Sequence, residues 1–173
     1  MSLSESELIG LTNREVEAYL RRMELQQFFA GCFAVDEVPT EELSRMKKFA
    51  LVVNLSISSQ AGSHFVVLQA DNENCLNYFD SLAINPAHLH SVAKNMLNGL
   101  GRSEICIQLP IRVQSVISAY CGVYSIFFVM LTDSERFPNQ SGLESFATAS
   151  SSDRLSNDGK CLRNIQRLLT QNT

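Results

Sequence analysis

Four side chains far apart in the sequence have the types that acyl transfer by a thiol requires. Cys121 is the candidate nucleophile, His64 its base, Asp80 the group that orients the histidine, and Gln114 a donor to an oxyanion. A thiol attacks a carbonyl as the thiolate, so it needs a positive local field and a nearby base. Cys121 stands where a helix is predicted to begin, and the free N–H groups there stabilise an anion.

His64 is the histidine best placed to act as the base. It follows a Gly-Ser turn at the edge of a predicted strand, where its imidazole would be held rigidly. His88 and His90 lie in a predicted surface helix and, two residues apart, point in different directions. We therefore expect no metal site at these two histidines.

Asp80 follows the next predicted strand, and a hairpin would bring it to the same end of the sheet as His64. There its carboxylate would accept the Nδ1 proton of the imidazole and so fix the tautomer. Asn77 and Glu73 remain alternative orienting groups, and the capping of a turn is another role open to Asp80.

The oxyanion of a tetrahedral intermediate needs donors, which the Cys121 N–H and the Gln114 side-chain amide would supply. Gln114 could equally be an exposed loop amide. We expect the two glycines beside the reacting groups, Gly62 and Gly122, to lie in the substrate path, because a residue without a side chain lets a substrate backbone come close.

Composition indicates one compact domain over residues 1–173, since 45% of the residues are apolar. The formal net charge of −4 and pI near 5.4 argue against a generally basic surface that coats nucleic acid. The start of the chain does not resemble a secretory signal, and the longest apolar stretch, Val123 to Leu131, is too short to span a membrane. We expect an unanchored intracellular protein.

The five cysteines are an odd number without a CxxC pair. This pattern fits neither a disulfide framework nor a zinc knuckle and favours a reducing compartment.

Apolar periodicity predicts an α+β order of elements. The expected helices are Asn13 to Gln27, opened by a capping box at Thr12, then Pro86 to Leu100, a buried helix from Cys121 to Leu131, and Leu162 to Leu169. The expected strands are a short one within 28–39, then Lys48 to Ile57, His64 to Gln69, Cys75 to Phe79 and Glu104 to Leu109. Pro138 to Lys160 is predicted to be a long surface loop.

These residues resemble a known family of peptidases. His64 in AGSHFVVLQ, Asp80 in NYFDSL, and Gln114 with Cys121 in VQSVISAYCG occur in the order and at intervals similar to those of the adenovirus endopeptidases and their relatives in other large DNA viruses and virus-like transposons. The broader clan includes proteases for ubiquitin-like modifiers. The amino-terminal helix and strand and the carboxyl-terminal LRNIQRLL are also similar.

Two neighbours of the reacting residues depart from the family pattern. Phe65 stands where the family usually has Trp, and Tyr120 precedes the nucleophile where small or polar residues are common. We expect the first change to preserve catalysis and the second to alter the cleft beside the thiol.

The resemblance implies a central mixed or antiparallel sheet packed against a buried helix that carries the nucleophilic cysteine. It also implies a cysteine endopeptidase that matures viral precursor proteins at Gly-containing sites through a thiol acyl-enzyme, in the nucleus or cytoplasm of a host cell and in the virion. The chain would act as a monomer without a cofactor. A protease for ubiquitin-like modifiers, a catalytically silent binding module and acyl transfer to an amine remain alternatives.

Adenovirus enzymes are stimulated by DNA and by a viral peptide that forms a disulfide with a second cysteine. The acidic composition here argues against DNA activation. Cys106 lies near the place of that second cysteine, so the resemblance leaves an activating peptide as an alternative, but we expect Cys106 to be a buried, inert thiol.

Overall fold

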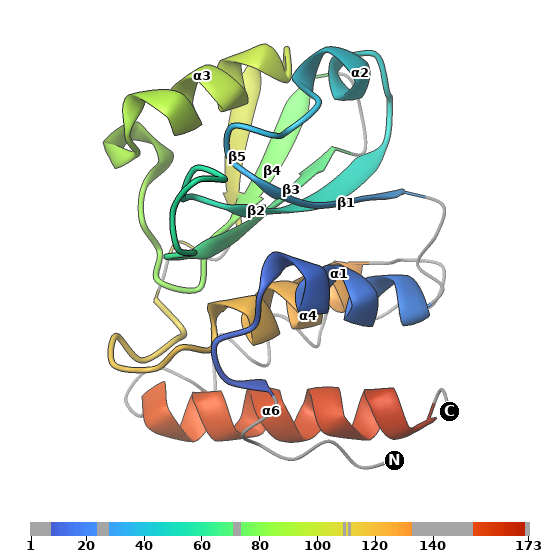
Figure 1. Cartoon of the computed structure of the whole chain (residues 1–173), viewed down its shortest axis with the longest axis vertical. Coiled ribbons are helices and arrows are strands. Elements are labelled where there is room, and N and C mark those ends of the chain that lie inside the picture. Colours follow the sequence, from blue (N-terminus) through green and yellow to red (C-terminus); the bar gives the residue numbers. More distant parts are fainter. Residues whose placement is uncertain are drawn as a thin grey trace.

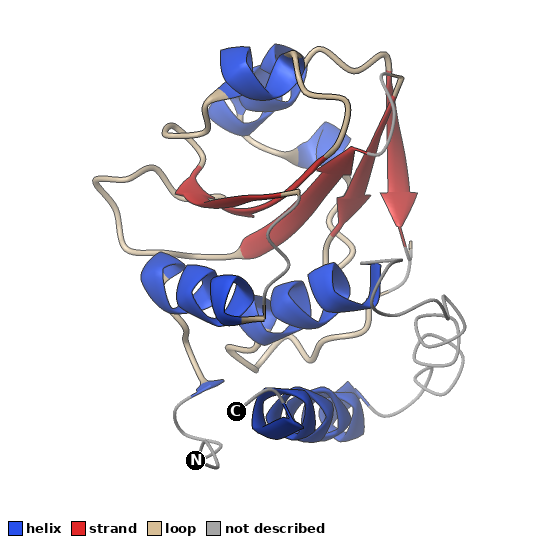
Figure 2. Ribbon diagram, turned by 90° about the vertical axis from the view of Figure 1, so that its right-hand side faces the viewer, coloured by secondary structure: helices blue, strands red, loops and turns tan. Residues whose placement is uncertain are grey.

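A five-stranded mixed sheet forms the middle layer of the molecule, with helices on both of its faces (Figures 1 and 2). The structure is a computed structural model that describes residues 8–23, 28–70, 74–108, 110, 112–132 and 154–171, with the side chains of 157–166 in the last segment. The strands are β1 (Phe29–Ala34), β2 (Phe49–Asn54), β3 (Phe65–Ala70), β4 (Cys75–Phe79) and β5 (Glu104–Gln108). The helices are α1 (Asn13–Arg22), α2 (Thr40–Ser44), α3 (Ser91–Gly99), α4 (Cys121–Thr132) and α6 (Arg154–Gln171), with a 3₁₀ turn at Pro86–His88.

The strands lie in the sheet in the order β1-β2-β3-β4-β5. The outer pairs, β1 with β2 and β4 with β5, are parallel, whereas the central strand β3 runs antiparallel to both of its neighbours, β2 and β4. The predicted hairpin of β3 and β4 is therefore confirmed, with Val67 opposite Phe79. This pairing brings the start of β3 and the end of β4 to one end of the sheet.

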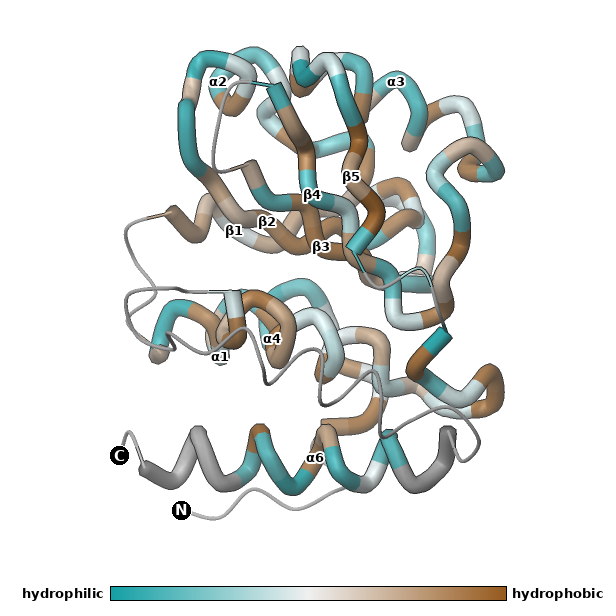
Figure 3. The backbone as a smooth tube through the Cα atoms, turned by 180° about the vertical axis from the view of Figure 1, so that it is seen from behind, coloured by the Kyte–Doolittle hydropathy of each residue, from teal (hydrophilic) through white to brown (hydrophobic). Residues whose placement is uncertain are grey.

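Alternation along the central strands divides the interior into two cores, one on each face of the sheet. In β2, Val52 faces the core under α1 and α4, while its neighbours Leu51 and Val53 face the core under α2 and α3. In β3, Val67 and Leu68 divide in the same way. Both faces of these strands are covered, which explains their nearly continuous apolar sequence and the brown colour of the central sheet in Figure 3.

Helix α4 lies inside the molecule, in contact with α1, β3 and α6. Its residues from Gly122 to Met130 are all buried, as the apolar sequence on every side of the helix predicts. Phe128 stacks on Phe79 of β4, with ring centroids 4.2 Å apart. The expected α+β fold, in which a sheet packs against a buried helix that begins at Cys121, is confirmed.

The chain around the predicted surface loop differs from expectation. Helix α6 begins at Arg154 and not near Leu162, so the prediction of a loop was wrong for residues 154–160, and residues 138–153 lie outside the described part of the chain. The many Ser, Asn and Gly residues of this stretch predicted a loop, but the Asn157 and Asp158 side chains are buried and hydrogen-bonded to neighbouring segments. Tertiary contacts here outweigh the low helix propensity of Asn and Asp.

The predicted free state of Cys106 is also wrong. Cys106 is half-buried and forms a disulfide with Cys75, across the parallel pair of β4 and β5. The register places Asn77 opposite Cys106 and Cys75 opposite Glu104, so the two cysteines are diagonal neighbours with Cα atoms 6.3 Å apart. Strand pairing, which cysteine spacing does not encode, brings them together.

Among the described residues, no helix is both long and apolar enough to cross a membrane.

Candidate active site

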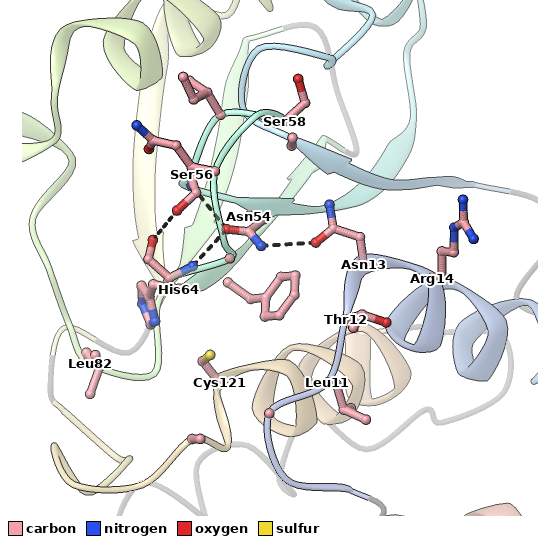
Figure 4. Close-up of a pocket in the computed structure, with 18 of the residues that line it drawn as sticks. Leu11, Thr12, Asn13, Arg14, Asn54, Ser56, Ser58, His64, Leu82 and Cys121 are labelled. Atoms are coloured by element: carbon pink, nitrogen blue, oxygen red, sulfur yellow. Dashed lines mark hydrogen bonds between the residues drawn. The ribbon is translucent and has the colours of Figure 1, made fainter.

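Cys121 is the first residue of α4, and its side chain is only partly buried. Helical hydrogen bonding begins with Tyr124 N–H donating to Tyr120 C=O at 3.0 Å, so the N–H groups before Tyr124 have no carbonyl of a preceding turn to bond. The sulfur lies on the side of the cleft that faces His64 (Figure 4). A thiolate at this position would be stabilised by the helix terminus.

His64 lies one residue before β3, with 8% of its surface exposed. Its C=O accepts a hydrogen bond from Leu55 N–H at 2.8 Å, which extends the pairing of β2 with β3 and fixes the backbone. Its Nε2 lies 2.7 Å from Oδ1 of Asp80. The ring is therefore held by its Nε2 and not, as the sequence analysis expected, by Nδ1, which leaves Nδ1 for the interaction with Cys121.

The surroundings of His64 favour the imidazolium. Burial alone would lower the pKa of His64, but the hydrogen bonds to Asp80 and Cys121 and the charges of these two groups outweigh it and raise the pKa from 6.5 to about 9. At neutral pH the ring thus carries a proton that it can donate.

Asp80 directly follows β4 and is 2% exposed. Oδ1 accepts the Leu82 N–H at 2.7 Å besides its contact with His64, and Oδ2 accepts the Tyr78 hydroxyl at 3.4 Å. Donors to both oxygens hold this buried carboxylate in one orientation. Tyr78 was not among the residues predicted for the site, although its place two residues before Asp80, on the same face of the strand, was a usable signal.

Asn77, one of the two alternative orienting groups, has a hydrogen bond within the sheet. The Asn77 side chain accepts a hydrogen bond from Nε2 of Gln108 at 3.0 Å, in the pair of β4 with β5. Glu73 lies outside the described residues.

Gln114 is 2% exposed and lines the same cleft as His64 and Cys121. Its Oε1 accepts the Ser81 hydroxyl at 2.6 Å. Its Nε2 donates to the C=O of Ser118 at 2.8 Å, and because a carbonyl can only accept, this bond determines which end of the amide is nitrogen. An amide nitrogen has two N–H groups, so one remains for a ligand. Gln114 is thus a fixed part of the cleft and not an exposed loop amide.

The cleft has a volume of about 730 Å³ and three walls. One is the segment from Gly10 to Arg14, the second is the loop from Ser56 to Ser63, and the third contains Gln114 and Ala119. Figure 4 shows Asn54 between the first two walls. Its Nδ2 donates to Oδ1 of Asn13 at 3.0 Å and its Oδ1 accepts backbone N–H groups of the second wall, so it ties the two together.

The two glycines have different surroundings. Gly62 lines the cleft, where a Cβ would lie 2.4 Å from Nδ2 of Asn54, too close for any other residue without movement. Gly122 is buried, and a Cβ there would lie 3.2 Å from side-chain atoms of Leu11 and Val16. The segment that comes close to Gly122 is therefore the chain's own amino-terminal segment and not a substrate, contrary to the prediction from the sequence.

Comparison with known proteins places this arrangement in a known architecture. No protein-family model matches the sequence, and no curated protein is similar enough to match. Among solved structures, the chain is similar to the ASFV pS273R protease, with a TM-score of 0.50 and 19% identity, over 91% of this chain and 67% of that one. The chain shares its fold with a protease. Identity at this level shows the fold alone, so the chemistry rests on the geometry of the site.

Proposed function

We propose that this chain is a cysteine endopeptidase of the adenovirus-protease type, with Cys121 as nucleophile and His64 as general acid and base. The observation that carries the proposal is the arrangement of the imidazole, with one nitrogen bonded to a buried carboxylate and the other interacting with a thiol at a helix N-terminus. A buried histidine that served only the core would not need to face the one free, partly exposed cysteine among the described residues. The protease fold of the structural neighbour supports the same conclusion.

In the proposed mechanism the Cys121 thiolate attacks the carbonyl carbon of a peptide bond. The backbone N–H of Cys121 and the free N–H of Gln114 Nε2 hold the oxyanion that forms. His64 gives its Nδ1 proton to the leaving amine, the C–N bond breaks, and a thioester remains. Water then attacks the thioester while His64 takes its proton, which releases the acid and restores the thiolate.

For the substrates, we propose precursor proteins of a virus, cut at Gly-containing sites. The Gly-containing site is what the resemblance to the adenovirus endopeptidases implies, and the viral protease among the structural neighbours supports a viral substrate. Proteins are substrates of proteases, so the partner class follows from the proposed activity.

The test is cleavage of short Gly-X-Gly peptides and of diglycine-ended conjugates of ubiquitin-like modifiers by the reduced wild type and by Cys121→Ala. We expect cleavage of the peptides by the wild type only. Processing of the conjugates alone would transfer the proposal to the modifier-specific branch of the clan. No cleavage by the wild type, together with no labelling of Cys121 by an electrophile that labels a known thiol peptidase, would favour a silent binding module.

Regulation and acyl acceptors are tested in the same assay. Addition of hydroxylamine reveals whether an amine competes with water for the acyl group. Addition of duplex DNA or of peptides from candidate precursors reveals whether either one stimulates the enzyme; we expect no stimulation by DNA, because the net charge is −4.

A further inference from the structure

The backbone that carries Gln114 is held on its sheet side by Ser81. The N–H groups of Val113 and Gln114 both donate to the C=O of Ser81, at 2.9 and 3.0 Å. Because Ser81 follows Asp80 directly, this anchor has its position set by the end of β4. It fixes one side of the segment only.

The other side of the segment is held by the first described turns of α6. Nδ2 of Asn157 donates to the C=O of Val113 at 3.2 Å, and Oδ1 of Asp158 accepts the N–H of Ser115 at 3.4 Å. The bonded backbone groups belong to the residues immediately before and after Gln114. Helix α6 thus binds the backbone on both sides of Gln114, and these two bonds help to fix the direction of the Gln114 side chain.

Tyr124 of helix α4 also takes part in this contact. The Tyr124 hydroxyl donates to Oδ1 of Asp158 at 2.8 Å and lies 3.2 Å from the C=O of Val113. Asn157 and Asp158 are 1% and 3% exposed, so these bonds are shielded from water and stronger than surface bonds of the same length. Oδ2 of Asp158 has no hydrogen-bond partner in the described part of the chain, so the acceptor at Oδ1 carries the function of this carboxylate.

We propose that Asp158, with Asn157, is a positioning residue of the active site, which holds the Val113–Ser115 backbone so that the Gln114 amide meets the oxyanion. This inference rests on the proposed function, because it assigns a task to the oxyanion donor. Asp158 itself is not one of the residues that line the cleft. A misplacement of about 1 Å in a catalytic group can cost roughly a hundredfold in rate, so loss of these α6 contacts should lower the rate measurably.

The experiment compares two reactions of Cys121 that differ in their need for an oxyanion. Acylation by p-nitrophenyl acetate passes through a tetrahedral oxyanion, whereas alkylation by iodoacetamide does not. Both rates are measured at Cys121 by peptide mass mapping of the whole chain, with Cys121→Ala as the background. Neither reaction requires a peptide substrate, so failure of the proposed peptidase activity would not affect the reading.

We expect Asp158→Ala to lower the acylation rate at least tenfold and leave the alkylation rate within about twofold, since loss of one oxyanion donor costs roughly 10²–10³. Asp158→Asn keeps an acceptor at the Oδ1 position and should retain the wild-type ratio of the two rates. Gln114→Ala should lower the ratio as Asp158→Ala does, and the double variant should fall no further, because both act through one donor. Asn164→Ala, an exposed position on α6, is the matched control.

Equal losses of acylation and alkylation in Asp158→Ala would assign Asp158 to general packing and overturn the proposal. Additive losses in the double variant would overturn it too, because Asp158 would then not act through Gln114. If Asp158→Ala does not fold, Tyr124→Phe, which removes only a hydroxyl, takes its place. We expect it to lower the rate ratio roughly fivefold, the effect of one ordinary hydrogen bond, and an unchanged ratio would count against the proposal.

Discussion

The Ser81 hydroxyl donates to Oε1 of Gln114 at 2.6 Å, one residue after the carboxylate that binds His64. Two consecutive residues after β4 therefore orient two different parts of the proposed machinery. Asp80 orients the imidazole of His64, the proposed general acid, and Ser81 orients the Gln114 amide that would bind the oxyanion. A shift of this short segment would disturb both functions at once.

The first prediction concerns that hydroxyl. Ser81→Ala removes the hydroxyl that donates to Gln114 Oε1, so among the described side-chain contacts of the amide the bond from Nε2 to the C=O of Ser118 is left to orient it. We expect kcat to fall by roughly 10²-fold with KM little changed, because the lost interaction belongs to the transition state. Measurement of peptide turnover checks this, with Ser103→Ala, a change of an exposed serine before β5, as the control. A rise in KM alone would show that Ser81 serves binding and not the oxyanion.

The second prediction is an alkaline limit of activity set by His64. The folded-state pKa of about 9 lies above the ordinary value of 6.5, so the proton that the leaving amine needs is lost as the pH rises through about 9. By linkage, the stability that this proton contributes is complete below pH 6.5 and is lost over the same rise to about 9. We expect kcat/KM and the denaturation midpoint to decline together in this window.

Asp80→Asn identifies the source of that limit. The hydrogen bond with Asp80 is the largest of the contributions that raise the pKa of His64. The neutral amide should therefore move the alkaline limb of the pH–rate profile toward lower pH and also reduce the rate. An alkaline limb that stays at the wild-type position in Asp80→Asn would assign the titration to another group.

The third prediction is selective modification of one thiol. Burial and the neighbouring Glu17 raise the pKa of Cys32 to about 12, and burial with Asp158 raises that of Cys161 well above its usual value. Iodoacetamide at neutral pH should therefore label Cys121 of the folded protein and leave the other two unmodified. Mass mapping before and after unfolding in guanidinium checks this, since the buried thiols should react only after unfolding. Rapid labelling of Cys161 in the native protein would contradict the packing of α6.

The fourth prediction concerns the contact of Gly62 with Asn54. Gly62→Ala brings a Cβ to 2.4 Å from Nδ2 of Asn54, so the amide must leave its place and give up its bonds to Asn13 and to the cleft loop. We expect the free energy of unfolding to fall by about 1–3 kcal/mol and the activity to fall with it. Urea denaturation of the double variant with Asn54→Ala tests the cause. It should be no less stable than Asn54→Ala alone, and additive losses would exclude the contact as the reason.

The sequence predicts the regular framework of the chain well because its pattern is local. The span of β4 agrees with the prediction at both ends, and α4 starts at the predicted residue, since a helix with apolar residues on all sides is distinctive. His64 and Asp80 were expected to meet because a hairpin aligns the ends of its strands, and they do. The single domain over the whole chain stays a prediction.

Relationships between distant segments escaped the sequence analysis. The order of residues does not show that Asn157 and Asp158 contact the loop of Gln114, and the Ser, Asn and Gly content of the surrounding stretch suggested a loop where a helix lies. The partner of Cys106 depends on the register of two parallel strands, and the ring nitrogen that faces Asp80 depends on a side-chain rotation. Gly122 was assigned to the cleft because chain proximity to Cys121 was taken as proximity to a substrate.

The helix that carries the sulfur is buried from Gly122 to Met130, whereas the second wall of the cleft, Ser56 to Ser63, is an irregular loop whose residues are exposed or half-buried. The nucleophile thus stands on a rigid interior element, and one surface that would contact a substrate stands on a peripheral one. Exchange of the exposed residues Ser58 to Ala61 should therefore change selectivity and leave the chemistry intact. Any attempt to shift the nucleophile itself would have to rebuild the interior.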